Sequence, residues 1–337
     1  ERLRFLCIVS SNLDEFFEIR AAGIKEQIKL RSSFRSTDGR TAAEVHRLLS
    51  EEAHAIVGDQ YELLNQDILP RLDSEGIRFL RRSNWTETQR EWIHAYFERE
   101  VMPLLTPIGL DPSHPFPRVL NKSLNFAVEL EGKDAFGRSS NAAIVQAPRL
   151  LPRVIRLPSA LAGCPFGFVF LSSILHAFVG HLFAGMEVKG CYQFRVTRNS
   201  DLFVDEEEVK NLRAKIQGEL PQRHFGDAVR LEVADTCSER MTAFLLDQFD
   251  LSQRDLYRVR GPVNLVRLMS VPDDVDRPDL KFRSFTPGTP AALTRRPDVF
   301  SAVRAGDILL HHPYQSFAPV IEMLEAASTD PAVVAIK

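Results

Sequence analysis

The chain has 337 residues, of which 44% are hydrophobic and 26% are charged, and its formal net charge is -3 at pH 7. This composition is ordinary for a soluble globular protein of two or three domains, and the acidic balance argues against a generic basic nucleic-acid-binding protein. The four cysteines lie far apart without a C-x-x-C pair, so we expect no zinc finger but reduced, mostly buried thiols in a cytoplasmic protein.

The two ends of the sequence look like cuts within a longer chain. Glu1 is not a start methionine, and a charged helical pattern begins at once without a signal peptide. Lys337 closes an apolar run that is typical of a buried strand. We therefore expect a fragment.

The first third of the sequence is patterned as amphipathic helices. Apolar residues recur at helical spacing over residues 3–28, 41–72 and 84–101, and Thr86 with Gln89 fits a capping box. Helices joined by short turns predict a helical bundle. The loop at residues 31–40 is basic and polar.

Residues 103–121 hold five prolines and predict an extended linker into a second domain. Runs typical of strands follow at residues 124–130, 141–147, 192–198 and 228–234, with helical patterns at 206–220 and 238–249. Because no regular βαβ repeat is visible, we expect a mixed α+β domain.

Residues 157–186 contain no charged side chain and are long enough to cross a bilayer. A proline, four glycines and a Ser-Ser pair divide this stretch, so we prefer a strand at 166–171, a helix cap at Ser172-Ser173 and a helix over 174–183. On that helix, we expect His176 and His181 to pack in the core rather than to ligate.

The last segment, residues 306–337, reads as strand, loop, helix and strand, the opening βαβ unit of a third domain. His311 and His312 follow its first strand, where ligands bind in open α/β sheets. They could accept a phosphoryl group, but packing against Tyr314 and Phe317 is the preferred interpretation.

No self-contained catalytic centre is visible in the sequence. A Walker A loop, the protein-kinase signatures, G-x-S-x-G, H-E-x-x-H and a dinucleotide fingerprint are all absent. Arg195 and Arg198, in "FRVTRNSDL", could hold a phosphate chain bidentately. They could equally pair with a carboxylate nearby, and the candidates are Asp201, Asp205 and Glu206.

The stretch "SSNLDEFFEIR", residues 10–20, supports two interpretations. Ser11 with Asp14, and Asn12 with Glu15, both fit a helix-capping pattern. The amide of Asn12 also offers a donor and an acceptor together, which matches the N6/N7 edge of adenine. From the residues alone, the cap is favoured.

Several motifs together resemble a known family. In chain order they are "ERLRFLCIVSSNLDEFFEIR", "TPIGLDPSHPFPRVLNKSLN", "FRVTRNSDL", "DLYRVRGPVNLVRLM" and "LLHHPYQSFAPVIEMLEAASTDPAVVAIK". This set is similar to the bacterial polyphosphate kinases of the first type, which work through a phosphohistidine. The resemblance implies a helical N-terminal domain over residues 1–105, an α+β head domain over 106–296, and a truncated phospholipase-D-like domain over 297–337.

The resemblance also implies chemistry. Family members transfer the terminal phosphate of ATP to inorganic polyphosphate, reversibly and with Mg²⁺, and form dimers or tetramers. The residue that contacts the nucleotide in the N-terminal domain of family members corresponds to Asn12, so the resemblance favours a nucleotide contact over a helix cap. We expect Asp14, Glu15 and Arg20 to stabilise the helix and not to bind a ligand. The family's phosphohistidine stands two residues before a lysine, and none of the nine histidines here does. We therefore expect no catalytic or metal-binding residue in this chain, and no activity of the fragment alone.

Two alternatives stay open. The chain could be a non-catalytic module that oligomerises and binds a nucleotide or polyanion. The second alternative, polyanion binding through Arg195, Arg198 and the basic loop, is less favoured because the chain is acidic overall. Nucleic acid is not expected as a partner. The sequence also leaves open a peripheral association with the inner membrane.

Overall fold

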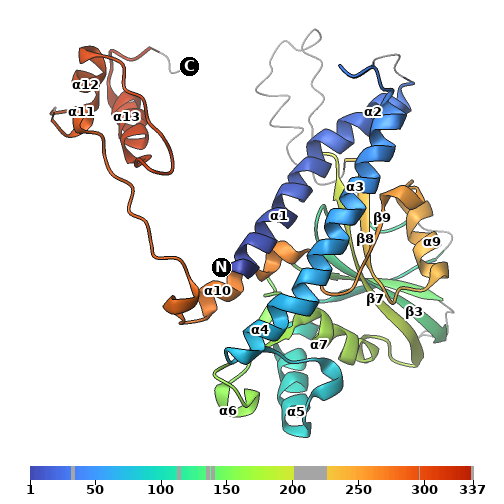
Figure 1. Ribbon diagram of the computed structural model, residues 1–337. Coiled ribbons are helices and arrows are strands. Elements are labelled where there is room, and N and C mark those ends of the chain that lie inside the picture. The colour runs from blue at the N-terminus through green and yellow to red at the C-terminus, as the bar shows by residue number, and fades with distance from the viewer. Residues whose placement is uncertain are drawn as a thin grey trace. The chain divides into compact units, whose positions relative to one another are not determined.

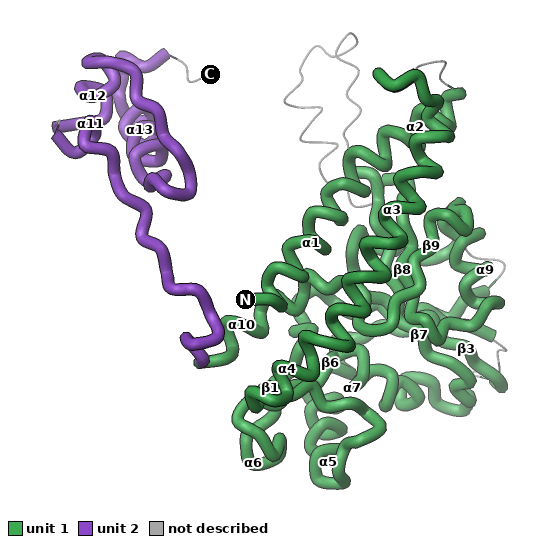
Figure 2. Tube along the Cα trace, in the orientation of Figure 1, with its two compact units in different colours: residues 1–276 green, residues 277–337 purple. Residues whose placement is uncertain are grey.

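The computed structural model describes residues 1–31, 35–111, 115–133, 137, 141–200, 226–295 and 297–334 (Figure 1). The chain divides into two compact units, residues 1–276 and residues 277–337 (Figure 2). The helix predicted at residues 206–220 and the predicted ion-pair partners Asp201, Asp205 and Glu206 lie outside the described residues.

The first unit begins with a long antiparallel pair of helices. Helix α1 (Arg2–Phe16) continues through a π-helical turn (Phe17–Ala21) into α2 (Ala22–Lys29). The chain returns as α3 (Ala42–Leu63), a second π-helical turn (Leu64–Ile68) and α4 (Leu69–Ser74), and Figure 1 shows the two arms side by side. The helical N-terminal region predicted from the apolar spacing is thus confirmed.

The third predicted helix is α5 (Glu87–Tyr96), which runs on through a π-helical turn (Phe97–Val101). The predicted capping box is confirmed, since the Thr86 hydroxyl accepts from the backbone N–H of Gln89 and the Gln89 side chain accepts from that of Thr86. Helix α5 packs against α6 (Ser159–Ala162) and α7 (Leu171–Phe178). Beside them lies a three-stranded sheet of β1 (Ile77–Phe79), β6 (Phe166–Phe170) and β5 (Val154–Arg156), in that order.

A six-stranded sheet forms the centre of the unit, with the order β2-β4-β3-β7-β8-β9. The strands are β2 (Thr106–Gly109), β3 (Leu124–Gly132), β4 (Ala142–Ala147), β7 (Met186–Arg198), β8 (Ala228–Ala234) and β9 (Leu256–Val259). Neighbours are antiparallel except β8 and β9, which are parallel. All four strands predicted for this region are present, and the first part of the proline-rich linker forms the edge strand β2.

The two faces of this sheet pack against different helices. Phe194 and Val196 of β7 join Leu231 of β8 and Leu245 of α9 (Glu239–Gln248) in an apolar core. On the other face, the ring of Tyr257 contacts Phe17 and stacks on His54 of α3. Alternation along β7 therefore turns its odd-numbered Arg195 away from the α9 core and toward the helical pair.

The apolar stretch at residues 157–186 folds as a strand followed by a helix, as predicted. It forms β6 and α7, and then a 3₁₀ helix at Val179–Leu182. The serine cap is wrong: α7 begins at Leu171, so Ser172 and Ser173 lie in its first turn and Phe170 is the N-cap. Among the described residues, no helix combines the length and the apolar character needed to cross a membrane.

The second unit contains α11 (Ala291–Thr294), α12 (Val299–Ala305) and α13 (Ala318–Thr329). Its central helix was predicted correctly, but the strand predicted at residues 307–310 is wrong, because these residues are irregular. Leu309 is 90% exposed and Val334 is 98% exposed. A strand needs a neighbour for its backbone groups, and among the described residues of this unit the one β-bridge, Gly288 to Gln315, does not involve residues 307–310.

The remaining short elements are α10 (Val271–Asp274) and 3₁₀ helices at Arg82–Asn84, Met102–Leu104, Gln253–Asp255, Leu265–Ser270 and Pro278–Leu280.

Candidate functional site

Asn12 lies in the middle of α1, exposed to solvent. Its amide has no hydrogen-bond partner among the residues that the structure describes. The helix begins ten residues earlier and continues past Phe16, so no helix terminus is available for Ser11 or Asn12 to cap. The cap interpretation favoured by the residues alone is therefore wrong.

Four large apolar side chains near Asn12 on α1 are exposed, and the charged side chain of Glu15 is exposed beside them. Phe5 is 53% exposed, Ile8 38%, Val9 40% and Phe16 37%. Their spacing of three, four or seven residues from Asn12 places them on the same side of the helix. We call this set the Asn12 stripe. A free amide among large apolar groups offers what a flat purine needs, since the apolar groups can contact the ring while the amide pairs with its polar edge.

The buried side of α1 explains why Asn12 faces outward. Asp14 is 5% exposed and accepts two hydrogen bonds from Arg195, Nη1 to Oδ2 and Nη2 to Oδ1, each 2.8 Å long. Two residues along an α-helix differ in direction by about 200°. Anchoring Asp14 to the sheet therefore directs Asn12 away from it.

Asp14 belongs to a buried network of four charged groups. Arg230 Nη2 donates to Asp14 Oδ1 at 2.6 Å and to Glu232 Oε2 at 3.1 Å, and Arg195 Nε also donates to Glu232. The four side chains belong to α1, β7 and β8, and each residue is at most 5% exposed. Burial acts to raise the pKa of Asp14, but the charges and hydrogen bonds of Arg195 and Arg230 outweigh it and lower the pKa. We call this set the Asp14 network.

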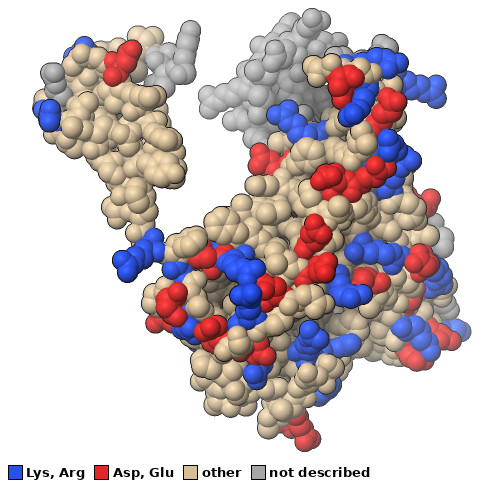
Figure 3. Space-filling model, viewed as in Figure 1, with Lys and Arg blue, Asp and Glu red and all other residues tan. Residues whose placement is uncertain are grey.

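Of the two strand arginines suggested for a polyanion role, Arg195 is excluded by its burial. Arg195 is 1% exposed and fully committed to carboxylates, so it cannot reach a phosphate chain in solvent. Arg198 is half-buried; it donates to the backbone carbonyls of Val119 at 3.1 Å and Gly226 at 2.9 Å and covers the ring of Phe249. Charges of both signs alternate over the face in Figure 3, without a broad basic surface there.

Sequence reasoning missed Arg230 and Glu232 as the other half of this network. Both lie on β8 at alternate positions, between Val229, Leu231 and Val233, which point into the core. The sequence does contain a signal for them, because two charged residues at a spacing of two within an otherwise apolar strand lie on the same face of that strand. Asp14 anchors its helix to the sheet, as expected. Glu15 and Arg20 were expected to stabilise the same helix, but both side chains are exposed to solvent.

His311 and His312 are exposed and lie in the second unit. The ring of His311 packs edge-on against Tyr314, and that of His312 against Phe317, with ring centres 5.1 Å apart in both pairs. The packing interpretation is confirmed. His312 Nδ1 also lies 2.8 Å from the backbone oxygen of Gln315.

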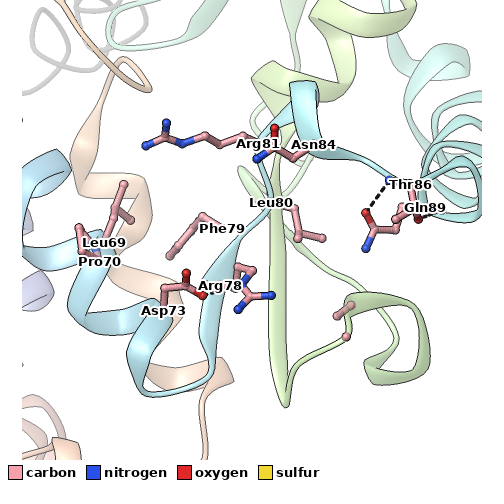
Figure 4. A pocket seen from close by; sticks show the side chains of 12 residues that line it. Leu69, Pro70, Asp73, Arg78, Phe79, Leu80, Arg81, Asn84, Thr86 and Gln89 are labelled. Atoms are coloured by element: carbon pink, nitrogen blue, oxygen red, sulfur yellow. Dashed lines mark hydrogen bonds and ion pairs between the residues drawn. The ribbon is translucent and has the colours of Figure 1, made fainter.

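Among the described residues, the first unit contains at least two cavities. One, of about 710 Å³, is lined by residues of α4, β1 and the start of α5 (Figure 4). Its polar groups largely satisfy one another: Arg78 Nε donates to Asp73 at 2.5 Å, and Thr86 and Gln89 form the capping box. In Figure 4, the Arg81 side chain extends away from the Asp73–Arg78 pair.

The second cavity, of about 720 Å³, shares Arg81 with the first and also contains Arg82, His176 and Arg260. Arg82 Nη1 lies 2.5 Å from His176 Nδ1, and Arg260 pairs with Asp235 at 3.4 Å. His176 and His181 are both exposed, so the prediction that they pack in the core is wrong. Neither cavity places a nucleophile against a general base.

Comparison with known families decides the relationship. A family model described as the polyphosphate kinase N-terminal domain matches residues 1–80, the polyphosphate kinase middle domain matches residues 88–271, and the polyphosphate kinase C-terminal domain 1 matches residues 298–337.

The chain belongs to the polyphosphate kinase family.

Individual polyphosphate kinases are also similar to this chain over its whole length. The polyphosphate kinase of Neisseria meningitidis serogroup B is 62% identical over all 337 residues, and that of Burkholderia cenocepacia is 57% identical over the same length. In both cases the match covers 100% of this chain and 49% of the relative, so the chain spans about half the length of these curated relatives.

A solved structure shares the fold. The crystal structure of polyphosphate kinase from Porphyromonas gingivalis aligns with a TM-score of 0.71 at 23% sequence identity, over 98% of this chain and 46% of that one. The resemblance and the multidomain fold inferred from the motifs are therefore confirmed. The N-terminal and middle polyphosphate kinase regions both lie within the first compact unit. The domain boundaries at residues 105 and 296 stay predictions.

Proposed function

We propose that this chain is part of an enzyme that transfers the terminal phosphoryl group of ATP to inorganic polyphosphate, reversibly. The observation that carries the proposal is the match to three polyphosphate kinase family models in chain order. Relatives that are 57% to 62% identical over the whole chain bear the same name. The phosphohistidine of this reaction would come from outside these 337 residues, because no histidine here precedes x-Lys.

Within this enzyme, Asn12 would contact the adenine of ATP. The support is its exposed amide, which lacks a protein partner among the described residues, and the apolar Asn12 stripe on either side of it. The amide would accept a hydrogen bond from the adenine N6 amino group and donate one to N7. Its part in the reaction is to hold the base and thereby help to position the triphosphate, since phosphoryl transfer depends mainly on positioning and charge stabilisation.

The test of this role is Asn12→Ala in a full-length polyphosphate kinase that carries this sequence. One hydrogen bond contributes about 0.5–1.5 kcal/mol, so KM for ATP should rise between about twofold and tenfold. The melting temperature should not change, because the side chain is exposed and loses no partner among the described residues. Ser11→Ala, on the same turn and also exposed, is the matched control and should leave KM unchanged.

An unchanged KM in Asn12→Ala, with the fold intact, contradicts the proposed contact. A parallel loss of thermal stability and activity would instead assign Asn12 a structural role.

Magnesium would also be needed, and the described residues do not fit it. Mg²⁺ prefers carboxylate and water oxygens in octahedral geometry. In the part of the chain that the structure describes, one group of three potential ligands lies close together, His94, Glu98 and His181, and two of its three donors are imidazole nitrogens. In line with the family resemblance, we place the magnesium ligands outside this sequence and derive no step from them.

The full-length enzyme should act as a homo-oligomer, a dimer or tetramer, in the cytoplasm or peripherally at the inner membrane, as the family resemblance implies. The overall proposal is tested by incubating the full-length protein with ATP and Mg²⁺ and measuring polyphosphate and ADP. Formation of both supports it, whereas a folded protein that forms neither refutes it. The 337-residue chain by itself should form no polyphosphate and should not be phosphorylated by ATP.

A further inference from the structure

A second cluster of ligating side chains lies away from Asn12. His94 on α5 and Glu98 on the following π-helical turn are four residues apart, which places them on one side of the helix. His181 reaches them from the 3₁₀ helix at Val179–Leu182. One ligand atom of each residue lies within 4.8 Å of the other two.

The distances within this cluster suit a metal ion better than direct bonds between the side chains. His94 Nε2 and His181 Nδ1 are 3.4 Å apart. Two nitrogens bound to a tetrahedral Zn²⁺ at about 2.0–2.1 Å would be about 3.3–3.4 Å apart. A direct N–H hydrogen bond is usually shorter, about 2.9–3.0 Å. The spacing therefore matches the separation expected for two nitrogens bound to one ion.

The two imidazole rings are held by buried aromatic side chains. The ring of His94 contacts Phe178 edge-on, with centres 4.9 Å apart, and that of His181 contacts Phe97 at 6.0 Å. Phe97 is 0% exposed and Phe178 is 7% exposed, so both are fixed in the core. Ligands whose positions are set by packing lose little freedom when they bind an ion.

Glu98 can complete the set by a small movement. Its Oε1 lies 3.7 Å from His94 Nε2, and its side chain is 53% exposed. A long, exposed carboxylate can move closer to both imidazoles by rotating about its side-chain bonds, without disturbing the core. Because the cluster is at the surface, water can fill a fourth position.

We propose that His94, Glu98 and His181 bind a divalent transition-metal ion, with Zn²⁺ as the expected occupant. Two imidazoles and one carboxylate form a donor set typical of Zn²⁺, Ni²⁺ or Co²⁺ and unsuited to Mg²⁺ or Ca²⁺. The ion would join two segments that are 87 residues apart in sequence, α5 with its π-helical turn and the 3₁₀ helix after α7. It would therefore stabilise the packing of α5 against α7.

The experiment uses the tag-free chain after removal of metals with a chelator. Zn²⁺ is titrated by calorimetry, and Co²⁺ is added separately because its visible absorption reports tetrahedral coordination. We expect one equivalent to bind and the melting temperature to rise. His181→Ala should weaken Zn²⁺ binding by more than about tenfold and abolish the thermal shift. Replacing a residue that only hydrogen-bonds to a metal ligand already lowers metal affinity by about tenfold or more, and His181 would bind the ion directly.

Matched variants make the outcome decisive. His176→Ala removes another exposed histidine of the same segment and should leave binding unchanged. Glu98→Gln keeps the size of the side chain and should also weaken Zn²⁺ binding. The proposal is overturned if the unmodified chain binds no stoichiometric Zn²⁺, in which case His94 and His181 form only a long hydrogen bond. It is equally overturned if His176→Ala weakens binding as much as His181→Ala.

Discussion

Replacing Asp14 by asparagine keeps the shape of a buried side chain and removes its charge. In the Asp14 network, two arginines are balanced by two carboxylates, and all four are buried. After Asp14→Asn, Glu232 alone faces Arg195 and Arg230, which leaves one positive charge uncompensated between α1 and the sheet. Breaking a buried ion pair by removing one partner costs about 3–5 kcal/mol, and we expect a loss of this size in the free energy of unfolding.

The loss is measured by urea unfolding at pH 7, followed both by circular dichroism and by tryptophan fluorescence, so that coincident curves establish a single transition. Glu51→Gln is the control. It breaks an exposed pair with Arg47, 2.8 Å long, and should cost less than about 0.5 kcal/mol. If Asp14→Asn costs no more than this control, the network does not hold α1 on the sheet and the argument fails.

Two further measurements test the same reasoning. Adding Arg230→Met to Asp14→Asn removes the surplus charge and keeps an apolar contact with Phe17, so the double variant should lose less than the sum of the single losses. The pKa of Asp14 is lowered in the folded chain, so its contribution is present above the unfolded value of about 3.9 and is lost as pH falls further. The difference between wild type and Asp14→Asn should therefore shrink below about pH 4.

Three other outcomes are expected. A thiol reagent should label the partly exposed Cys164 before the three buried cysteines. Burial raises the pKa of Cys7 and of Cys191 to about 12, so these two thiols hold little reactive thiolate. Fast labelling that persists in Cys164→Ser would contradict this. Thr86→Ala removes the N-cap of α5 and should lower the unfolding free energy by about 1 kcal/mol; no measurable change would show that the cap is dispensable. For Asp255, burial opposes ionisation, but hydrogen bonds from His46 and the charge of Lys25 lower its pKa. Asp255→Asn should thus reduce stability at pH 7 and make it less dependent on pH below about 4, and an equal dependence on pH in both proteins would exclude this pairing.

Local patterns in the sequence predicted the longer helices and strands of the first unit, but not the short ones such as β1 and β5. The alternation at residues 192–198 identified β7 and also which of its side chains share a face, because the period of two is a property of any extended chain. The capping box at Thr86 was equally readable, since both of its partners lie within one turn. The strand predicted at residues 307–310 failed, because pairing depends on a neighbour and not on the segment itself.

The sequence by itself determined the family of this protein, the longer helices and strands of its first unit, and Asn12 as the residue to test. Only the tertiary structure decided what the charged side chains do. Asp14 and Arg195 are 181 residues apart, and nothing local shows that one neutralises the other. His94 and His181 likewise meet only because α5 packs against α7. Charges and ligands act over a few ångströms in space, whereas sequence patterns report spacing along the chain, so such pairs become visible only once the chain is folded.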